Sequence, residues 1–231
     1  MFTTFHKTDA EIETQIREEL RWDCRTENHI IRVSVADGVV TLSGTVNAYA
    51  IKCAAEEAAH RIAGVQGLTN EIVVKIPYLE FKADIEIASA AAQIFEWNTL
   101  IPHERISALL NNGWVTLVGT VDCWTHREEA QRAVSVLAGV RGVTNNIRVN
   151  AAQIEAGRVC KAIEATLDRH SPQEIAQRFG LKQIHIEMED GTVRLSGEVP
   201  NWGERCMTVT AAGYAPGVRA IVDDLKVVVN A

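Results

Sequence analysis

Hydrophobic and polar residues alternate along two short segments that flank an Asp-Gly pair near the start of the chain. The apolar positions are Val33 and Val35 before the pair and Val40 and Leu42 after it, and hydroxyl residues fill most of the positions between them after the pair. A period of two places the apolar side chains on one face of a strand pair. Glycine accepts the positive φ of a tight turn. The pattern therefore predicts a β-hairpin with one buried face and one solvated face.

The hairpin segment ADGVVTLSGTV returns twice, as NNGWVTLVGTV and EDGTVRLSGEV. Three sets of glycines recur with the same offsets of 75 and 78 residues. The sets are Gly38, Gly113 and Gly191; Gly44, Gly119 and Gly197; and Gly64, Gly139 and Gly217. This register indicates three homologous units, with domains expected at 1–76, 77–150 and 151–231. Structural turn roles are expected for the first two sets. Val118 interrupts the polar face and is expected to mark a contact of the middle unit with a neighbour.

Each unit also carries two helical patterns. The first helices are expected at Asp9 to Trp22, Asp84 to Trp97 and Ile154 to Leu167. The second helix shows an i, i+3, i+4, i+7 stripe that begins with Ala55, Ala58, Ala59 and Ile62 in the first unit. Asn47, Asp122 and Pro200 stand where its N-caps are expected. A third strand follows, so each unit is an α+β domain of order α-β-β-α-β, a three-stranded mixed sheet covered on one face by two helices. The third unit inserts SPQEIAQRFGLKQ between its first helix and first strand.

The composition indicates an ordinary globular protein. The chain has 231 residues, 47% of them hydrophobic, with a formal net charge of -7. The negative charge disfavours a nucleic-acid partner. No segment has the length of a membrane span, and no export signal is seen, so the expected location is cytoplasmic, or periplasmic if the true N-terminus lies upstream. The five cysteines lack CxxC spacing and are expected to be reduced thiols.

The sequence offers no catalytic constellation. The seven histidines do not recur at equivalent positions, and none stands in HExxH or at zinc spacing with cysteines. His126 is expected on a solvated helix start. No nucleophile elbow, phosphate-binding loop or dinucleotide fingerprint occurs. The sequence therefore predicts a protein that is not an enzyme and that needs no cofactor or metal.

An aromatic residue followed three positions later by a cation recurs at the start of each second helix. The pairs are Tyr49 with Lys52, Trp124 with Arg127, and Trp202 with Arg205. At a membrane surface the ring would lie at headgroup level and the cation would meet phosphate, so these six residues are candidate lipid contacts. The alternative is structural, with the ring covering a sheet edge and the cation stacked on it. Trp22 and Trp97, at the ends of the first helices, are expected to be core anchors or contacts between domains.

The repeat unit resembles the BON domain, named after bacterial OsmY and nodulation proteins. The resemblance rests on Asp37-Gly38-Val39 to Gly44 and on Gly64-Val65 to Asn70, with counterparts in the second unit, and covers nearly the whole chain. The third unit departs by carrying Asp223 at the Asn position. The resemblance implies a phospholipid- or envelope-interacting module associated with osmotic or envelope stress.

Two functional hypotheses follow from these observations. In the first, a triple BON-domain protein binds an anionic phospholipid surface or an envelope component peripherally. In the second, a soluble stress-related scaffold or sensor binds a small ligand, an ion or a protein partner between its domains. A protein partner or a homo-oligomer is compatible with either.

Overall fold

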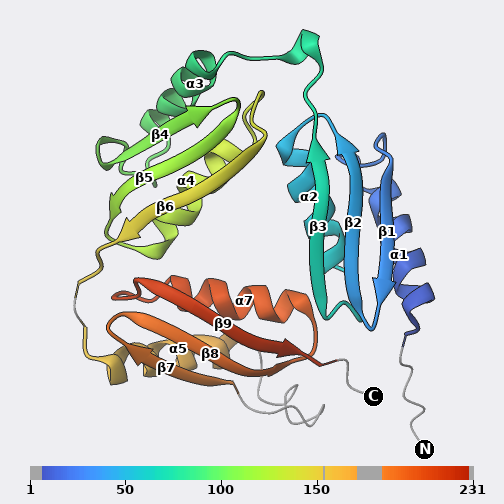
Figure 1. Ribbon diagram of the computed structural model, residues 1–231. Coiled ribbons are helices and arrows are strands. Elements are labelled where there is room, and N and C mark those ends of the chain that lie inside the picture. The colour runs from blue at the N-terminus through green and yellow to red at the C-terminus, as the bar shows by residue number, and fades with distance from the viewer. Residues whose placement is uncertain (1–6, 153, 171–183, 229–231) are drawn as a thin grey trace, which may run out of the picture.

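The computed structural model describes residues 7–152, 154–170 and 184–228, which form three copies of one α+β unit (Figure 1). The first unit contains α1 (Asp9–Trp22), β1 (Ile31–Ala36), β2 (Val39–Val46), α2 (Tyr49–His60) and β3 (Gly67–Val74). The second contains α3 (Asp84–Trp97), β4 (Ile106–Asn111), β5 (Trp114–Val121), α4 (Trp124–Ser135) and β6 (Gly142–Val149). The third contains α5 (Ala156–His170), β7 (His185–Glu189), β8 (Thr192–Val199), α7 (Trp202–Gly213) and β9 (Ala220–Val227). The predicted fold class and element order are confirmed, and the third unit's insertion at 171–183 lies outside the described residues.

Each unit folds its own three-stranded sheet with the hairpin's second strand in the centre. The strand orders are β1-β2-β3, β4-β5-β6 and β7-β8-β9. The first two strands pair antiparallel, with Val33 opposite Leu42, and the last two pair parallel, with Leu42 opposite Asn70. The apolar residues of this register meet the helices in three separate cores. Small residues such as Ala55, Ala58 and Ala59 are fully buried, so the second helix lies close on the sheet.

The hairpin turns have both central residues at positive φ, as a type I′ turn requires. In the first unit these are Asp37 at 50° and Gly38 at 72°, and Asn112-Gly113 and Asp190-Gly191 repeat the geometry. The carboxylate of Asp9 accepts hydrogen bonds from the backbone N–H groups of Asp37 and Gly38, at 2.9 and 3.0 Å. The first helix therefore holds the turn as well as the core.

The second set of glycines lies inside strands, which differs from the turn role expected for it. Gly44 is a residue of β2 with φ of 142°, and a Cβ built on it would lie 2.6 Å from the carbonyl oxygen of Ile30. Gly119 and Gly197 repeat the positive φ at 146° and 136°. A side chain is excluded at this position by the chain entering the first strand.

The second helices begin one residue later than their expected caps. The N-caps are Ala48, Cys123 and Asn201, and among these only the Asn201 side chain accepts a capping hydrogen bond, from the N–H of Glu204 at 2.9 Å. The expected cap Asp122 instead pairs with Arg105 of the same hairpin, at 2.5 and 2.9 Å. Its carboxylate therefore pairs with the residue that precedes β4 and does not cap α4.

Trp22 and Trp97 are 86% and 79% exposed, so the expectation that they anchor a core or a domain contact is wrong. The buried positions of their helices end at Leu20 and Phe95. Each tryptophan follows two residues later, which is about 200° further round the helix and therefore on its solvent side. The position equivalent to these tryptophans in the third unit, counted from the core residues, is Arg169.

The three units are arranged around a common middle (Figure 1). The second helices α2, α4 and α7 and the third strands β3, β6 and β9 lie toward this middle, and the first helices lie toward the outside. In the same view the sheets lie in front of their helices, so their uncovered faces point to one side of the particle.

Candidate functional site

The three aromatic residues that open the second helices each contact a different unit from their own. Tyr49 packs against the core of the second unit. Trp124 lies against Gly213 of the third unit, and Trp202 stacks on His60 of the first. The contacts therefore run from the first unit to the second, from the second to the third, and from the third back to the first. We call these three contacts the aromatic joints.

At the first joint Tyr49 is half-buried among residues of its neighbour. Burial, with smaller contributions from Cys53 and Glu56, raises the pKa of the Tyr49 hydroxyl to about 12. A hydrogen bond with the Val143 backbone, at the start of β6, acts in the opposite direction on this pKa. The ring is therefore held in the joint as a neutral phenol with a polar contact on the second unit.

At the second joint Trp124 occupies the space that a side chain would need on α7. A Cβ built on Gly213 would lie 2.5 Å from Cδ1 of Trp124. Gly213 follows a fully buried Ala212 at the last turn of α7. Glycine at this helix end is thus explained by close packing of the indole from the second unit.

At the third joint the rings of Trp202 and His60 are 4.0 Å apart between centroids and inclined by 14°. Burial, and next the charge of Arg205, lowers the pKa of His60 to about 4. His60 and Gly213 are equivalent positions in their units, each the last residue of its second helix. Two of the joints therefore use one geometry, in which the first residue of a second helix packs on the last residue of another. The three contacts form a closed ring of domains within a single chain.

The cations of the repeated pairs are engaged within their own units. The guanidinium carbons of Arg127 and Arg205 lie 4.7 and 4.4 Å from the ring centroids of Trp124 and Trp202. These are the stacked pairs of the structural alternative. Lys52 instead donates from Nζ to the carbonyl oxygen of Ile72 at 2.9 Å. Two of the three candidate pairs, Trp124 with Arg127 and Trp202 with Arg205, are thus stacked, whereas Lys52 bonds to the third strand of its own unit. Each of the three rings faces another domain, and the contact of these residues with lipid stays a prediction.

Asn70 and Asn145 tie the third strand to the second helix, a role that the sequence did not reveal. The Asn70 amide donates to the carbonyl oxygen of Lys52 at 3.1 Å and accepts from the N–H of Ile72 at 3.2 Å. Asn145 makes the same two bonds with Arg127 and Ile147. In the third unit Asp223 cannot donate, and its carboxylate pairs with Arg205 Nε at 2.8 Å. The repeated cation is therefore part of this clasp, and the departure at Asp223 is matched by a different bond to the same helix.

Three buried polar side-chain atoms near the ends of second helices have no hydrogen-bond partner within the described part of the chain. They are Oδ1 of Asn47, Nε2 of His60 and Nδ1 of His126. The solvated helix start expected for His126 is thus wrong for this atom. A buried polar atom without a partner costs about 1–3 kcal/mol. These atoms mark the helix ends, where the joints also lie, as places for a water molecule or a polar ligand.

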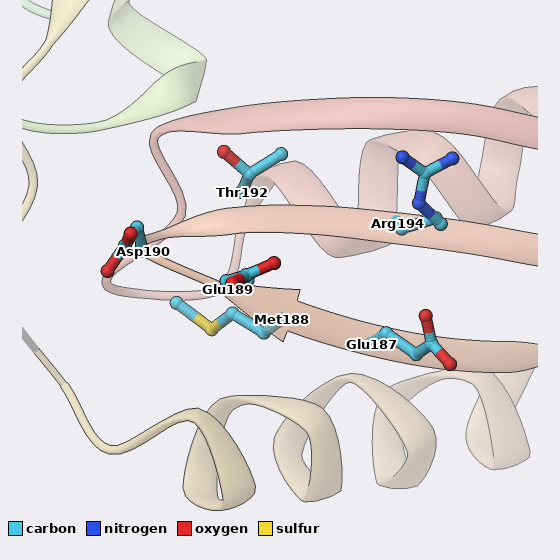
Figure 2. A pocket seen from close by; sticks show the side chains of 6 residues that line it. All are labelled: Glu187, Met188, Glu189, Asp190, Thr192 and Arg194. Carbon is cyan, nitrogen blue, oxygen red and sulfur yellow. The ribbon is translucent and has the colours of Figure 1, made fainter.

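A separate surface pocket lies at the tip of the β7-β8 hairpin (Figure 2). Its lining is Glu187, Met188, Glu189, Asp190, Thr192 and Arg194. Arg194 is paired with Asp224 on the neighbouring strand, so the pocket has no free cation to bind an anion. The six lining residues include no histidine and no cysteine.

Within residues 7–152, 154–170 and 184–228, no group of His, Cys, Asp and Glu side chains is placed to hold a metal ion. No helix of the same described ranges is both long and apolar enough to cross a membrane.

Comparison with known proteins identifies the repeat unit. The family model described as BON domain matches residues 8–76, 83–151 and 160–229. Osmotically-inducible protein Y of Escherichia coli (strain K12) is 26% identical over 133 residues, which are 55% of this chain and 66% of that protein, just under two thirds of its length. Two structures of CdsD, a structural protein of the type III secretion system of Chlamydia trachomatis, align with 14% and 13% identity over 93% and 96% of this chain and 91% and 99% of theirs. Their TM-scores are 0.27 and 0.26. The chain belongs to the BON domain family and contains three BON domains in tandem.

Proposed function

We propose that this chain is a non-enzymatic binding protein of osmotic or envelope stress, in which three BON domains act as one body and bind a small ligand or ion at the joints between them. The observation that carries the proposal is the cycle of aromatic joints. An aromatic residue opens the second helix in all three units, and each copy contacts another domain. The unpaired atoms of Asn47, His60 and His126 lie at or near the same helix ends and offer polar groups to a ligand. The similarity to a protein named osmotically inducible supports the stress role.

A thermal-shift screen over potassium, calcium and small metabolites tests the binding. We expect a saturable rise of the melting temperature with one class of ligand, because a ligand that binds only the folded state stabilises it by mass action. Trp202→Ala opens the third joint and should reduce this rise, whereas Trp97→Ala, on the solvent side of α3, should leave it unchanged. A flat screen would overturn binding at the joints.

A growth experiment tests the stress role and the compartment. Deletion of the gene should slow growth after osmotic upshift, and the wild-type chain should restore growth where Trp202→Ala restores less. Equal growth of the deletion strain would contradict the stress role. We also propose the cytoplasm as the location, which fractionation of the same cells tests.

A second candidate function is peripheral binding to phospholipid, favoured by the exposure of Trp22 and Trp97 at equivalent helix ends. Exposed tryptophans at such positions can enter the headgroup layer. Flotation with phosphatidylglycerol vesicles distinguishes the surfaces. We expect wild type to float and the Trp22→Ser/Trp97→Ser variant to lose this binding. If a folded variant of Tyr49, Trp124 and Trp202 to Ala loses it instead, the second-helix residues make the contact, and if wild type does not float, lipid binding is refuted.

A further inference from the structure

The uncovered sheet face of the middle unit differs from the other two by carrying a fixed, exposed aromatic ring. Trp114 begins β5 directly opposite Gly142 of β6. A Cβ built on Gly142 would lie 2.5 Å from Cζ3 of Trp114, so the six-membered ring lies over the glycine backbone. The indole Nε1 donates to Oγ1 of Thr144 at 2.8 Å. The ring is therefore held against the sheet at two points, and 50% of the residue remains exposed.

The surroundings of this ring combine apolar and neutral polar side chains. Leu109, which is 57% exposed, stands on β4 opposite Thr116, and Val118 stands opposite Ser107 and Asn146 in the next row of the same face. Thr144 continues the row of Thr116 on β6. Val118, which interrupts the polar alternation in the sequence, is thus part of this face.

Charge is almost absent from the face. Among the residues of β4, β5 and β6, all of which are described, Arg148 is the one charged side chain on the uncovered side. It pairs in register with Thr120, six residues along β5 from Trp114, which is about 20 Å along a strand. In the third unit the same face carries Glu187, Arg194 and Asp224, and in the first Arg32 and Glu71. The uncharged character is therefore specific to the middle unit.

The chemistry of the face selects one kind of ligand. The indole N–H is already bonded, so the ring offers its π face for stacking. An anionic ligand would need a cation near the ring and a cationic ligand would need a carboxylate, and no residue of the three strands supplies either there. Arg141, just before β6, packs its side chain against Gly113 of the hairpin turn. A purely apolar partner would leave the hydroxyl and amide groups of Ser107, Thr116 and Asn146 buried without partners, which is costly. A neutral ring that presents C–H groups on one side and hydroxyls at its edge satisfies both the indole and its polar neighbours.

We propose that the uncovered β4-β5-β6 face binds a neutral oligosaccharide, with one sugar ring stacked on Trp114 and neighbouring hydroxyls bonded to Ser107, Thr116 and Asn146. The site is separate from the aromatic joints and does not depend on a ligand there. All three uncovered faces point to one side of the particle, so a glycan chain can reach this site without displacing a domain (Figure 1).

Titration of the full chain with maltohexaose, cellohexaose and chitohexaose, followed by calorimetry and by the indole N–H resonances, tests the proposal. We expect saturable binding of at least one of them with a shift of the Trp114 indole signal. Trp114→Ala should weaken this binding at least about tenfold and Trp114→Tyr by only about threefold, because a stacking ring is retained. Trp97→Ala, an exposed tryptophan on a helix, is the matched control and should bind as wild type does.

Three results would overturn the proposal: no binding of any of the three sugars, equal loss in Trp97→Ala, or binding that survives in a folded Trp114→Ala chain. Self-association of the wild type that Trp114→Ala abolishes, without sugar binding, would assign the face to contact between copies instead. Because Gly142 is uncovered in Trp114→Ala, its melting temperature and near-ultraviolet circular dichroism are compared with those of Trp114→Tyr.

Discussion

The second and third units share one hairpin but hold it differently. In the second unit Asp84 accepts two hydrogen bonds, both of 2.8 Å, from the turn amides of Asn112 and Gly113. Counted from the core residues, Ala156 stands at the position of Asp84 in the third unit and has no carboxylate to offer. In the third unit Asp223 keeps the bond from the backbone N–H of Leu225, at 3.1 Å, but replaces the amide bond to the second helix by an ion pair with Arg205. The fold thus tolerates the loss of the hydrogen bonds from the first helix to the hairpin turn. It also tolerates a different bond between the third strand and the second helix, because the apolar core is retained in all three units.

The largest effect on stability is expected from the hydrogen bonds that tie the third strand of the second unit to its second helix. Asn145→Ala removes hydrogen bonds to Arg127, Gln131 and Ile147 at a half-buried position. The second unit should lose about 3 kcal/mol of stability, because the partner groups lose their bonds in a partly desolvated site. Hydrogen exchange of the β5 and β6 amides measures this locally, and the β8 amides of the third unit serve as the internal control.

The matched variant Asn145→Asp tests whether the second unit can form the ion pair that the third unit has at this position. Arg127 already lies near these bonds, because its Nη2 donates to the backbone carbonyl oxygen of Asn145 at 3.2 Å. We expect Asn145→Asp to cost less than Asn145→Ala, because the guanidinium can pair with the new carboxylate as Arg205 does with Asp223. Equal costs would show that the ion pair in the third unit depends on features that the second unit lacks.

The free energy of unfolding should depend on pH through the third joint, by about 2 kcal/mol or less because His60 is only half-buried. Its pKa of about 4 in the closed joint lies below the ordinary value of 6.5. The contribution of the joint to stability is therefore complete above pH 6.5 and is lost as the pH falls from there through about 4. NMR titration of His60 checks this directly. In Trp202→Ala, which removes the stacked ring, the pKa should rise toward 6.5, and a wild-type value already near 6.5 would mean that the joint is open in solution.

A smaller effect on stability is expected from the carboxylate that accepts hydrogen bonds from the hairpin turn. Removing it should destabilise the second unit, and adding it should stabilise the third. Asp84→Ala removes two bonds to backbone amides and a favourable charge at the start of α3, at a cost of about 1.5 kcal/mol. Ala156→Asp supplies the missing carboxylate to the turn at Asp190 and Gly191 and should stabilise the third unit by about 0.5–1 kcal/mol. Urea unfolding followed by exchange in each unit measures both. Destabilisation by Ala156→Asp would show that α5 does not present this position to the turn as α3 does.

The sequence predicted the strands, the hairpin turns and the repeat, but it missed the helix caps and the asparagine bonds within a unit and all of the contacts between units. Alternation around Val33 and Leu42 and the glycine register were enough for the sheet, the turn and the repeat, because each unit repeats one local pattern. The joints could not be derived, since the partner of Trp202 is His60, and nothing in the spacing of the two residues relates a third-unit helix start to a first-unit helix end. A signal was nevertheless present: His60 and Gly213 occupy equivalent helix ends, and a glycine at a helix's last residue is consistent with an incoming ring.

The smallest expected effect concerns the exposed tryptophans, and here the sequence did contain the answer. Ile12, Ile16 and Leu20 define the buried stripe of α1, and a residue two positions beyond Leu20 must point away from it. Trp22→Ser and Trp97→Ser should therefore change stability by less than about 0.5 kcal/mol each, because neither ring leaves a cavity. Arg169→Trp, the reciprocal change in the third unit, should be equally neutral. Denaturant midpoints of the three variants measure this, and a loss above about 1 kcal/mol in either serine variant would place that ring in a contact between domains. Neutrality leaves these tryptophans available for the vesicle surface, so that flotation of the same variants reports on binding alone.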